Sequence, residues 1–89
     1  METTFDFSVA LEKLKHGGRV ARTGWNGKGQ FVRMFMPYSD QQFKVSEVEP
    51  TDGTLMGHLL LKNAQNQLVP WIPSNGDLVA DDWHVVEKQ

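Results

Sequence analysis

The strongest restriction on the fold comes from two stretches of the chain that carry apolar side chains on both faces of a predicted strand. In the stretch 30–36, Phe31 and Phe35 point to one side, while Val32 and two methionines point to the other. The stretch 55–62 alternates in the same way and also lacks a polar face. Strands of this kind need a cover on both faces of the sheet that they build.

One amphipathic helix is predicted near the N-terminus, over residues 7–16. Asp6 is placed to cap its first turn, and Gly17 follows its end, where glycine tolerates a left-handed backbone. A single helix of this length lies across one face of a sheet and leaves the other to be covered by something else. The apolar side chains with helical spacing are Phe7, Ala10, Leu11 and Leu14.

The sequence of the other segments predicts short strands separated by turns. Ser74 and Asp77 have the spacing of a capping box, which predicts a short helical turn over residues 75–81. Residues 38–54 show only weak β character. We therefore expect an α+β fold, a small antiparallel sheet with one N-terminal amphipathic helix and a short C-terminal helical turn. The expected strands cover residues 19–22, 30–36, 55–62, 67–69 and 83–87, with a four-residue turn at 63–66.

The chain length indicates one domain over residues 1–89. A domain of this size buries only roughly 60–65% of the surface that its unfolded chain exposes. Since one helix covers one sheet face, we expect a homo-oligomer in which the uncovered face or an exposed sheet edge makes the contact. The competing interpretation is that residues 38–54 fold over that face.

Composition and motifs exclude several classes of function. The net charge of -2 argues against a nucleic-acid binder, and the absence of cysteine removes disulfides and thiolate metal sites. No apolar run reaches the ~18 residues of a membrane span, and the N-terminus lacks the features of a signal peptide, so we expect a cytoplasmic protein. The three histidines have no metal-ligand spacing, and the pair Asp81–Asp82 is interpreted as a solvated surface pair. We expect no metal, no cofactor and no enzymatic activity.

The charge is unevenly distributed along the chain. Residues 1–33 sum to +3 and residues 34–89 to -5. A basic first third in an acidic protein suits a small anionic ligand, although a solvated mixed surface has the same pattern.

Several side chains are suited to holding a flat, anionic ligand. Indole rings stack on purine faces, an arginine fork matches phosphate oxygens, and successive turn amides form anion-binding nests. Each residue also has a structural interpretation: Trp83 as core, Trp71 as a packing residue, Asn26–Gly27 as a turn and Asp77 as a helix cap. The candidates from residue type alone are Trp25, Trp71, Arg22, Lys28, Asn26, Asp77 and the amides around Gly27 and 74–76.

Two motifs make the chain similar to a known family. They are the stretch 17–29, GGRVARTGWNGKG, and the stretch 69–83, which contains VPWIPS followed by DLVADDW. With these motifs the chain resembles the Thoeris anti-defense proteins of the second type, which are small phage and prophage proteins. The resemblance covers the whole chain length and includes the amphipathic helix before the first motif.

The resemblance implies a function that the residues alone do not reach. Family members act as sponges that bind the cyclic ADP-ribose-type messenger (gcADPR) of the bacterial Thoeris system without cleaving it, so that the effector stays inactive. It further implies a homo-oligomer, a tetramer built from dimers with the signal held between protomers, acting in the host bacterial cytoplasm. The positions carried over as ligand-binding are Phe7, Arg22, Trp25, Asn26, Gly27, Lys28, Trp71, Ser74 and Asp77.

Two other functions remain open from the sequence. One is a small phosphodiesterase or glycosidase that cleaves the same cyclic nucleotide, with Asp77 or Asp81 as the acid or base. The other is a protein-interaction module that blocks a host factor and retains no small molecule.

Overall fold

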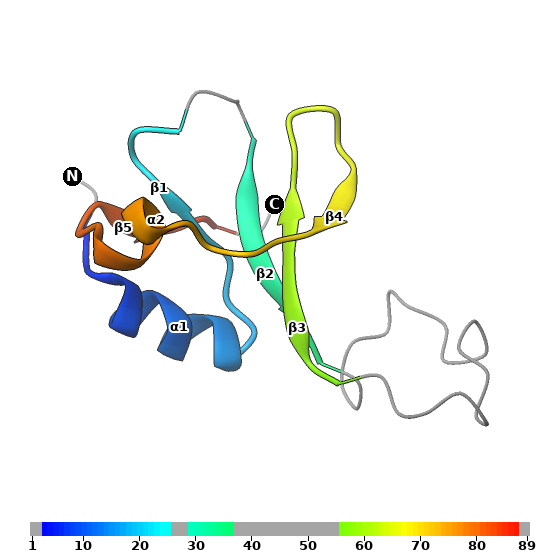
Figure 1. The fold of residues 1–89 in the computed structure, drawn as a ribbon, viewed down its shortest axis with the longest axis horizontal. Coiled ribbons are helices and arrows are strands. Elements are labelled where there is room, and N and C mark those ends of the chain that lie inside the picture. Colours follow the sequence, from blue (N-terminus) through cyan, green and yellow to red (C-terminus); the bar gives the residue numbers. More distant parts are fainter. Residues whose placement is uncertain (1–2, 26–28, 37–55, 88–89) are drawn as a thin grey trace.

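A five-stranded antiparallel sheet with two helices forms the part of the chain that the computed structural model describes, residues 3–25, 29–36 and 56–87 (Figure 1). The strand order is β4-β3-β2-β1-β5, and each neighbouring pair is antiparallel. The predicted α+β class is confirmed. The elements are α1 (Phe7–Lys15), β1 (Val20–Arg22), β2 (Phe31–Phe35), β3 (His58–Lys62), β4 (Leu68–Pro70), α2 (Asn75–Val79) and β5 (Trp83–Val85).

Helix α1 begins where its capping residue predicts. The Asp6 carboxylate accepts hydrogen bonds from the Ser8 hydroxyl at 2.8 Å and from the Val9 N–H at 3.1 Å. These donors lower the pKa of Asp6, because they stabilise its charged form. The first turn of the helix therefore receives the hydrogen-bond acceptor that it lacks internally.

The C-terminal end of α1 is closed by two glycines. The Gly17 N–H donates to the Leu14 carbonyl at 3.1 Å, and the Gly18 N–H donates to the Lys13 carbonyl at 2.8 Å, which is the Schellman pattern. Gly17 adopts φ +88°, a backbone angle that residues with a Cβ rarely adopt. The predicted helix is confirmed to within one residue, with His16 as its C-cap.

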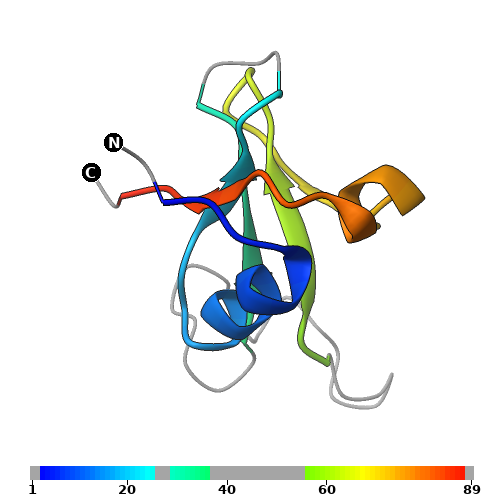
Figure 2. The ribbon, with the colours of Figure 1, turned by 90° about the vertical axis from the view of Figure 1, so that its left-hand side faces the viewer.

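The core lies between α1 and one face of the sheet (Figure 2). Ala10 and Leu14, two members of the predicted stripe, are fully buried against strand residues. Partly buried side chains on α1, β2, β3 and the β4–α2 connection extend this core. The strand residues at its centre are Val20, Val32 and Trp83, all 0% exposed.

The opposite face of the sheet is better covered within a single chain than the alternation pattern predicts. Phe31, Phe35 and Leu60 lie on that face and are only 6–8% exposed. The most exposed hydrophobic side chains near α2 are instead Ile72 at 89% and Val79 at 83%. The homo-oligomer stays a prediction. The most exposed apolar side chains lie near α2 and not on the sheet face that holds Phe31, Phe35 and Leu60.

Several element boundaries differ from those expected. Pro70 belongs to β4, where it pairs with Leu60, because β4 is an edge strand and its outer side needs no N–H donor. Strand β3 starts at His58, α2 ends at Val79 and β5 ends at Val85, each shorter than predicted. The weakly β region expected at 38–54 lies outside the described residues. Within the described part of the chain, no helix has the length and apolar character needed to cross a membrane.

Candidate functional site

An aromatic cluster stands at the junction of both helices and β5. The fully buried ring of Trp83 lies 5.4 Å from Phe7, 5.4 Å from Trp25 and 6.1 Å from Trp71, centroid to centroid. Trp25 and Trp71 are 6.2 Å apart with ring planes at 70°. Edge-to-face geometry of this kind fixes the rings relative to one another. Trp25 and Trp71 are only partly buried, so each keeps some ring surface for another molecule.

Backbone pairing places these rings. Trp83 pairs with Arg22 in the register of β1 and β5, and its backbone also exchanges two hydrogen bonds with Phe5. The Trp71 N–H donates to the Leu59 carbonyl at 3.1 Å, which fixes the start of the connection to α2. The Trp25 N–H donates to the Arg22 carbonyl at 3.2 Å in the turn after β1.

Arg22 forms an ion-pair network beside the aromatic cluster. Its Nε donates to Oδ1 of Asp82 at 2.9 Å, and its Nη1 donates to Oδ1 of Asp77 at 3.1 Å. The side chains are 26% exposed for Arg22, 32% for Asp82 and 13% for Asp77. One guanidinium therefore joins β1 to α2 and to the segment before β5.

The capping box of α2 connects this network to the tryptophans. The Ser74 hydroxyl accepts from the Asp77 N–H at 3.1 Å, and the Ser74 N–H donates to Oδ2 of Asp77 at 2.9 Å. The indole N–H of Trp83 donates to the Asp77 carbonyl at 3.0 Å. Asp77 thus orients α2, Arg22 and Trp83 together, and its predicted role as a helix cap is confirmed.

The ion pairs and hydrogen bonds of this network shift the pKa values of Arg22, Asp77 and Asp82. Burial raises the pKa of Asp77, but the hydrogen bonds from Ser74 and Arg22 more than offset this effect, and the pKa ends below its usual value. Hydrogen bonding from Arg22 is the main cause that lowers the pKa of Asp82. The pKa of Arg22 is raised, first by Asp82 and then by Asp77. At neutral pH these three side chains carry one positive and two negative charges.

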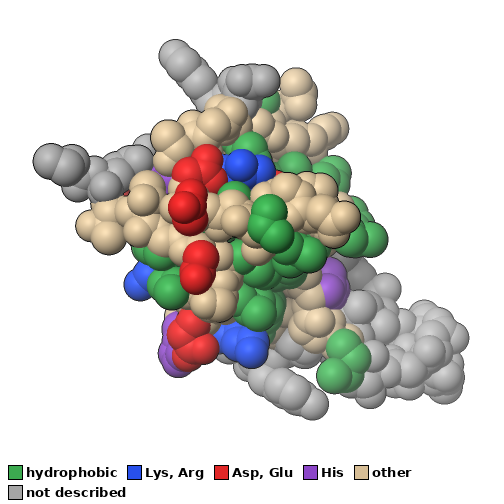
Figure 3. Space-filling model, turned by 60° about the vertical axis from the view of Figure 1, so that its left-hand side comes forward, with side chains coloured by type: hydrophobic (Ala, Val, Ile, Leu, Met, Phe, Trp, Pro, Cys, Tyr) green, Lys and Arg blue, Asp and Glu red, His purple; other side chains and the backbone are tan. Residues whose placement is uncertain are grey.

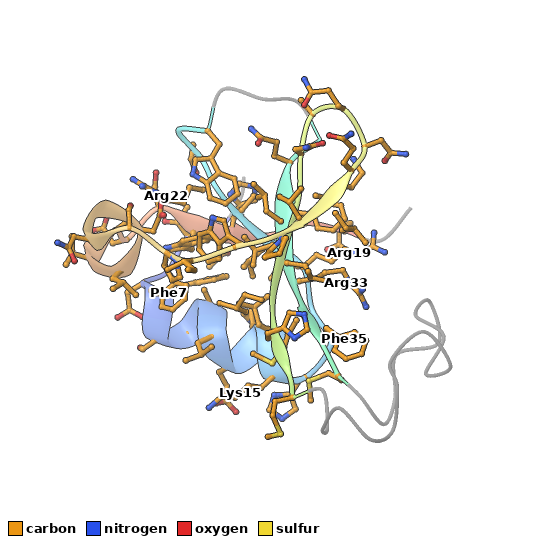
Figure 4. The ribbon with its side chains drawn as sticks, turned by 45° about the vertical axis from the view of Figure 1, so that its right-hand side comes forward. Phe7, Lys15, Arg19, Arg22, Arg33 and Phe35 are labelled. Atoms are coloured by element: carbon orange, nitrogen blue, oxygen red, sulfur yellow. The ribbon has the colours of Figure 1, made fainter. Side chains whose placement is uncertain are left out.

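The structure brings together six of the predicted ligand-binding residues. They come from α1, β1, the turn after it, the β4–α2 connection and α2, and Figure 4 shows the labelled Phe7 and Arg22 on the same side of the sheet. The other three, Asn26, Gly27 and Lys28, lie outside the described residues. The six are Phe7, Arg22, Trp25, Trp71, Ser74 and Asp77.

Two features of the site differ from the sequence interpretation. Asp82 was expected to belong to a solvated pair, and this is wrong, because it is half-buried and bound to Arg22; only Asp81 is exposed. Trp83 is core, as predicted, but it is also the central ring of the candidate site. One sequence signal could have indicated the ion pair of Asp82 with Arg22. Asp82 directly precedes the core residue Trp83, whose strand packs beside the strand that ends at Arg22.

Neither of the two described cavities is lined by the predicted ligand residues. Trp25 and Trp71 of the aromatic cluster are partly exposed outside these cavities. Figure 3 shows a face of the molecule on which hydrophobic side chains gather beside acidic ones. Among the residues that the structure describes, no group of three His, Asp or Glu side chains could hold a metal ion.

Comparison with known proteins gives two matches. Residues 5–86 match the family described as Thoeris anti-defense 2-like domain. A curated protein of Bacillus phage SP01, Thoeris anti-defense 2, is 38% identical over 90 residues, which cover 97% of this chain and 99% of that protein. Neither name is that of an enzyme. The matched region contains the complete aromatic cluster and the Arg22 network.

Proposed function

The chain belongs to the Thoeris anti-defense 2-like family, and from this we propose that it suppresses a bacterial Thoeris response by binding a cyclic ADP-ribose-type messenger and holding it uncleaved. The observation that carries the proposal is the 38% identity, over nearly the full length of both chains, to a phage protein named for anti-defense against Thoeris. The place of action is the cytoplasm of the infected bacterium, where the messenger is made. No cofactor takes part.

The aromatic cluster supplies the stacking surface for a purine. Trp25 and Trp71 each pack edge-on against Trp83, and their own ring planes meet at 70°, so one indole can stack on the base while the other closes its edge. Stacking on an aromatic side chain contributes about 1–3 kcal/mol per base. Because the rings are already fixed by their neighbours, little side-chain entropy is lost when the ligand binds.

The polar groups beside the rings fit the ribose hydroxyls better than the phosphates. Asp77 and Asp82 are ionised and accept hydrogen bonds from hydroxyl or amine groups, while Arg22 keeps the N–H groups that the two carboxylates do not occupy. The two negative charges outweigh the single positive one. The two phosphates of the messenger therefore need cations from outside this network, and Lys28 or a second copy of the chain provides them.

A second copy also suits the surface around the site. Ile72 directly follows Trp71, and Leu78 directly follows Asp77; these two apolar side chains are 89% and 47% exposed. We place the contact between copies here, in a homo-oligomer that reaches a tetramer built from dimers. Docking on this surface closes the open side of the aromatic cluster. Such closure matters, because a sponge needs nanomolar affinity, about -12 kcal/mol, and an open surface of this size does not supply it.

The test is binding followed by recovery of the messenger. The protein is incubated with a cyclic ADP-ribose isomer, separated from free ligand and denatured by heat. The molecular mass of the released compound is then measured by mass spectrometry. Unchanged mass in stoichiometric amount supports sequestration. A changed mass would mean that the chain is an enzyme, and no retained compound would mean that it acts on a protein; either result refutes the proposal.

Matched variants locate the site. Trp71→Ala removes the stacking surface and is expected to weaken binding by tenfold or more, whereas Trp71→Phe keeps a flat ring and retains most of the affinity. The contact between copies is tested with Leu78→Glu by light scattering after size exclusion. We expect this variant to have a smaller mass than the wild type and to lose messenger binding at the same time. A wild-type monomer at micromolar concentration would refute the shared site.

A further inference from the structure

A cavity of about 420 Å³ lies on the sheet face opposite the aromatic cluster. Its walls include Phe31 of β2, Lys62 of β3, and Arg19 directly before β1, together with Asn66, Leu68 and Val86. We call it the Phe31 cavity. Phe31 faces away from the buried core because its neighbour Val32 is at the centre of that core. Figure 4 shows Arg19 on the opposite side of the sheet from Phe7 and Arg22.

Two cations converge on the Phe31 ring from either side of its strand. The guanidinium carbon of Arg19 stands 4.8 Å from the ring centroid, and Nζ of Lys62 stands 5.5 Å from the same point. Since β2 lies between β1 and β3, the two cations approach from opposite neighbouring strands. Both are within the range of a cation–π contact, which holds their side chains in place.

Lys62 is further fixed by the backbone. Its Nζ donates to the Gly29 carbonyl at 3.1 Å, which leaves two of its three N–H groups for another acceptor. Among the described residues, neither Arg19 nor Lys62 forms an ion pair. Glu87 also lines the cavity, and it is the only acidic side chain among the described lining residues. Among the described lining residues, the two cations therefore outnumber the one acid, and together these side chains carry a net positive charge.

The shape and charge of the cavity select a class of ligand. Glu87 offsets part of the charge of the two cations, so a ligand has to compete with this carboxylate for them, and a dianion does so better than a single carboxylate. Leu68 and Val86 provide an apolar wall, which suits an organic body better than a bare inorganic ion. A phosphate monoester combines both features, because its group carries close to two negative charges at pH 7.

We propose that the Phe31 cavity binds phosphate monoesters of small organic molecules, with the phosphate held between Arg19 and Lys62 and the organic body against Leu68 and Val86. This site is separate from the tryptophan site proposed for the messenger. It lies on the other face of the sheet and shares none of the predicted ligand residues. The proposal goes beyond the proposed function and stands independently of it.

The test is an NMR titration with three probes: phenyl phosphate, inorganic phosphate and benzoate. We expect phenyl phosphate to bind most tightly, inorganic phosphate more weakly because it lacks the organic body, and benzoate weakest because it carries one charge. The amide signals of Phe31, Lys62 and Asn66 are expected to shift. The indole N–H signals of Trp25, Trp71 and Trp83 are expected to stay in place, since these rings lie on the core side. Equal binding of benzoate and phenyl phosphate, or shifts confined to the indole signals, would overturn the proposal.

Charge variants and pH give an independent check. Arg19→Gln and Lys62→Gln are each expected to weaken phenyl phosphate binding by roughly tenfold or more, because each removes a charge-assisted hydrogen bond. Arg19→Lys keeps the charge and is expected to lose less, and the control Lys15→Gln, which removes an exposed charge on α1, is expected to change affinity less than twofold. Binding is expected to weaken several-fold from pH 7.5 to pH 5, as the phosphate loses its second charge near pH 6. An equal loss in the control variant, or affinity independent of pH, would refute the site.

Discussion

Replacing Arg22 with methionine tests the ion-pair network that links β1, α2 and the segment before β5. Arg22→Met keeps most of the aliphatic stem but removes the donors to Asp77 and Asp82, at 3.1 and 2.9 Å. Two partly buried carboxylates then lose their charged partner. We expect the variant to fold with lower stability and to keep the Trp83 contacts that do not depend on Arg22.

The size of the effect follows from the exposure of the groups. A hydrogen bond to a charged group contributes about 1.5–3 kcal/mol when it is well shielded. Arg22 is 26% exposed and Asp82 is 32% exposed, so water can partly replace the lost bonds and each contribution falls to the low end. We expect a loss of about 2–3 kcal/mol in the free energy of unfolding at pH 7. In a domain this small, that loss lowers the Tm by roughly 10–20 °C.

The same variant has a defined pH dependence. The pKa values of Asp77 and Asp82 lie below their usual value of 3.8 in the folded protein. A carboxyl with a lowered pKa stabilises the fold above its unfolded pKa, and this contribution is lost as the pH falls through the folded value. The stability gap between wild type and Arg22→Met is therefore complete at pH 7 and narrows below about pH 4.

Urea denaturation followed by tryptophan fluorescence, repeated between pH 7 and pH 3, measures this gap. Asp82→Asn and the double variant complete a mutant cycle, and the exposed neighbour Asp81→Asn serves as the control with a change of less than about 0.5 kcal/mol. A gap that stays constant with pH, or additive effects in the cycle, would show that Arg22 contributes by packing and not by charge.

Three further substitutions test the core, a close backbone approach and a helix cap. Leu14→Ala removes a fully buried side chain and is expected to cost about 2–5 kcal/mol, measured by urea denaturation; a loss below 1 kcal/mol would contradict the assigned core. Gly18→Ala places a Cβ 2.9 Å from a backbone oxygen of α1 and is expected to cost more than about 1 kcal/mol in the same assay. Gly24→Ala, with its nearest contact at 3.7 Å, is the tolerated control, and equal losses would refute the clash. Ser74→Ala is expected to cost about 1 kcal/mol in thermal unfolding, while Ser74→Thr keeps the capping oxygen and stays close to wild type; equal Tm values would exclude the cap.

Elements set by short-range interactions were predicted well. Helix α1 depends on a cap at Asp6, a stripe of apolar residues and a glycine end, all of which act within a few residues. The hairpin turn is similarly local, because the Asn63 side chain accepts from the N–H groups of Gln65 and Gln67. Contacts between residues a few positions apart can be predicted directly from the sequence.

The candidate site was predicted in its residue types but not in its interactions. The sequence predicts Phe7, Trp25 and Trp71 as ligand residues, and the structure brings their rings around Trp83. The sequence predicts Arg22 as one of several ligand-binding residues, with its guanidinium matched to phosphate oxygens. It is already bound to two carboxylates, so its first role in the fold is to join three segments.

Residue order was thus sufficient to determine the helix and its ends, the hairpin, the capping box and the buried character of Trp83, since each depends on local spacing or on side-chain hydrophobicity. Only the tertiary structure decided that Asp77 and Asp82 meet Arg22 and that Arg19 and Lys62 meet over Phe31. The pairs made by Arg22 span 55 and 60 positions in the chain. They exist because β5 docks beside β1 in a register set by the packing of Trp83, and no local pattern of residues encodes the register between segments so far apart.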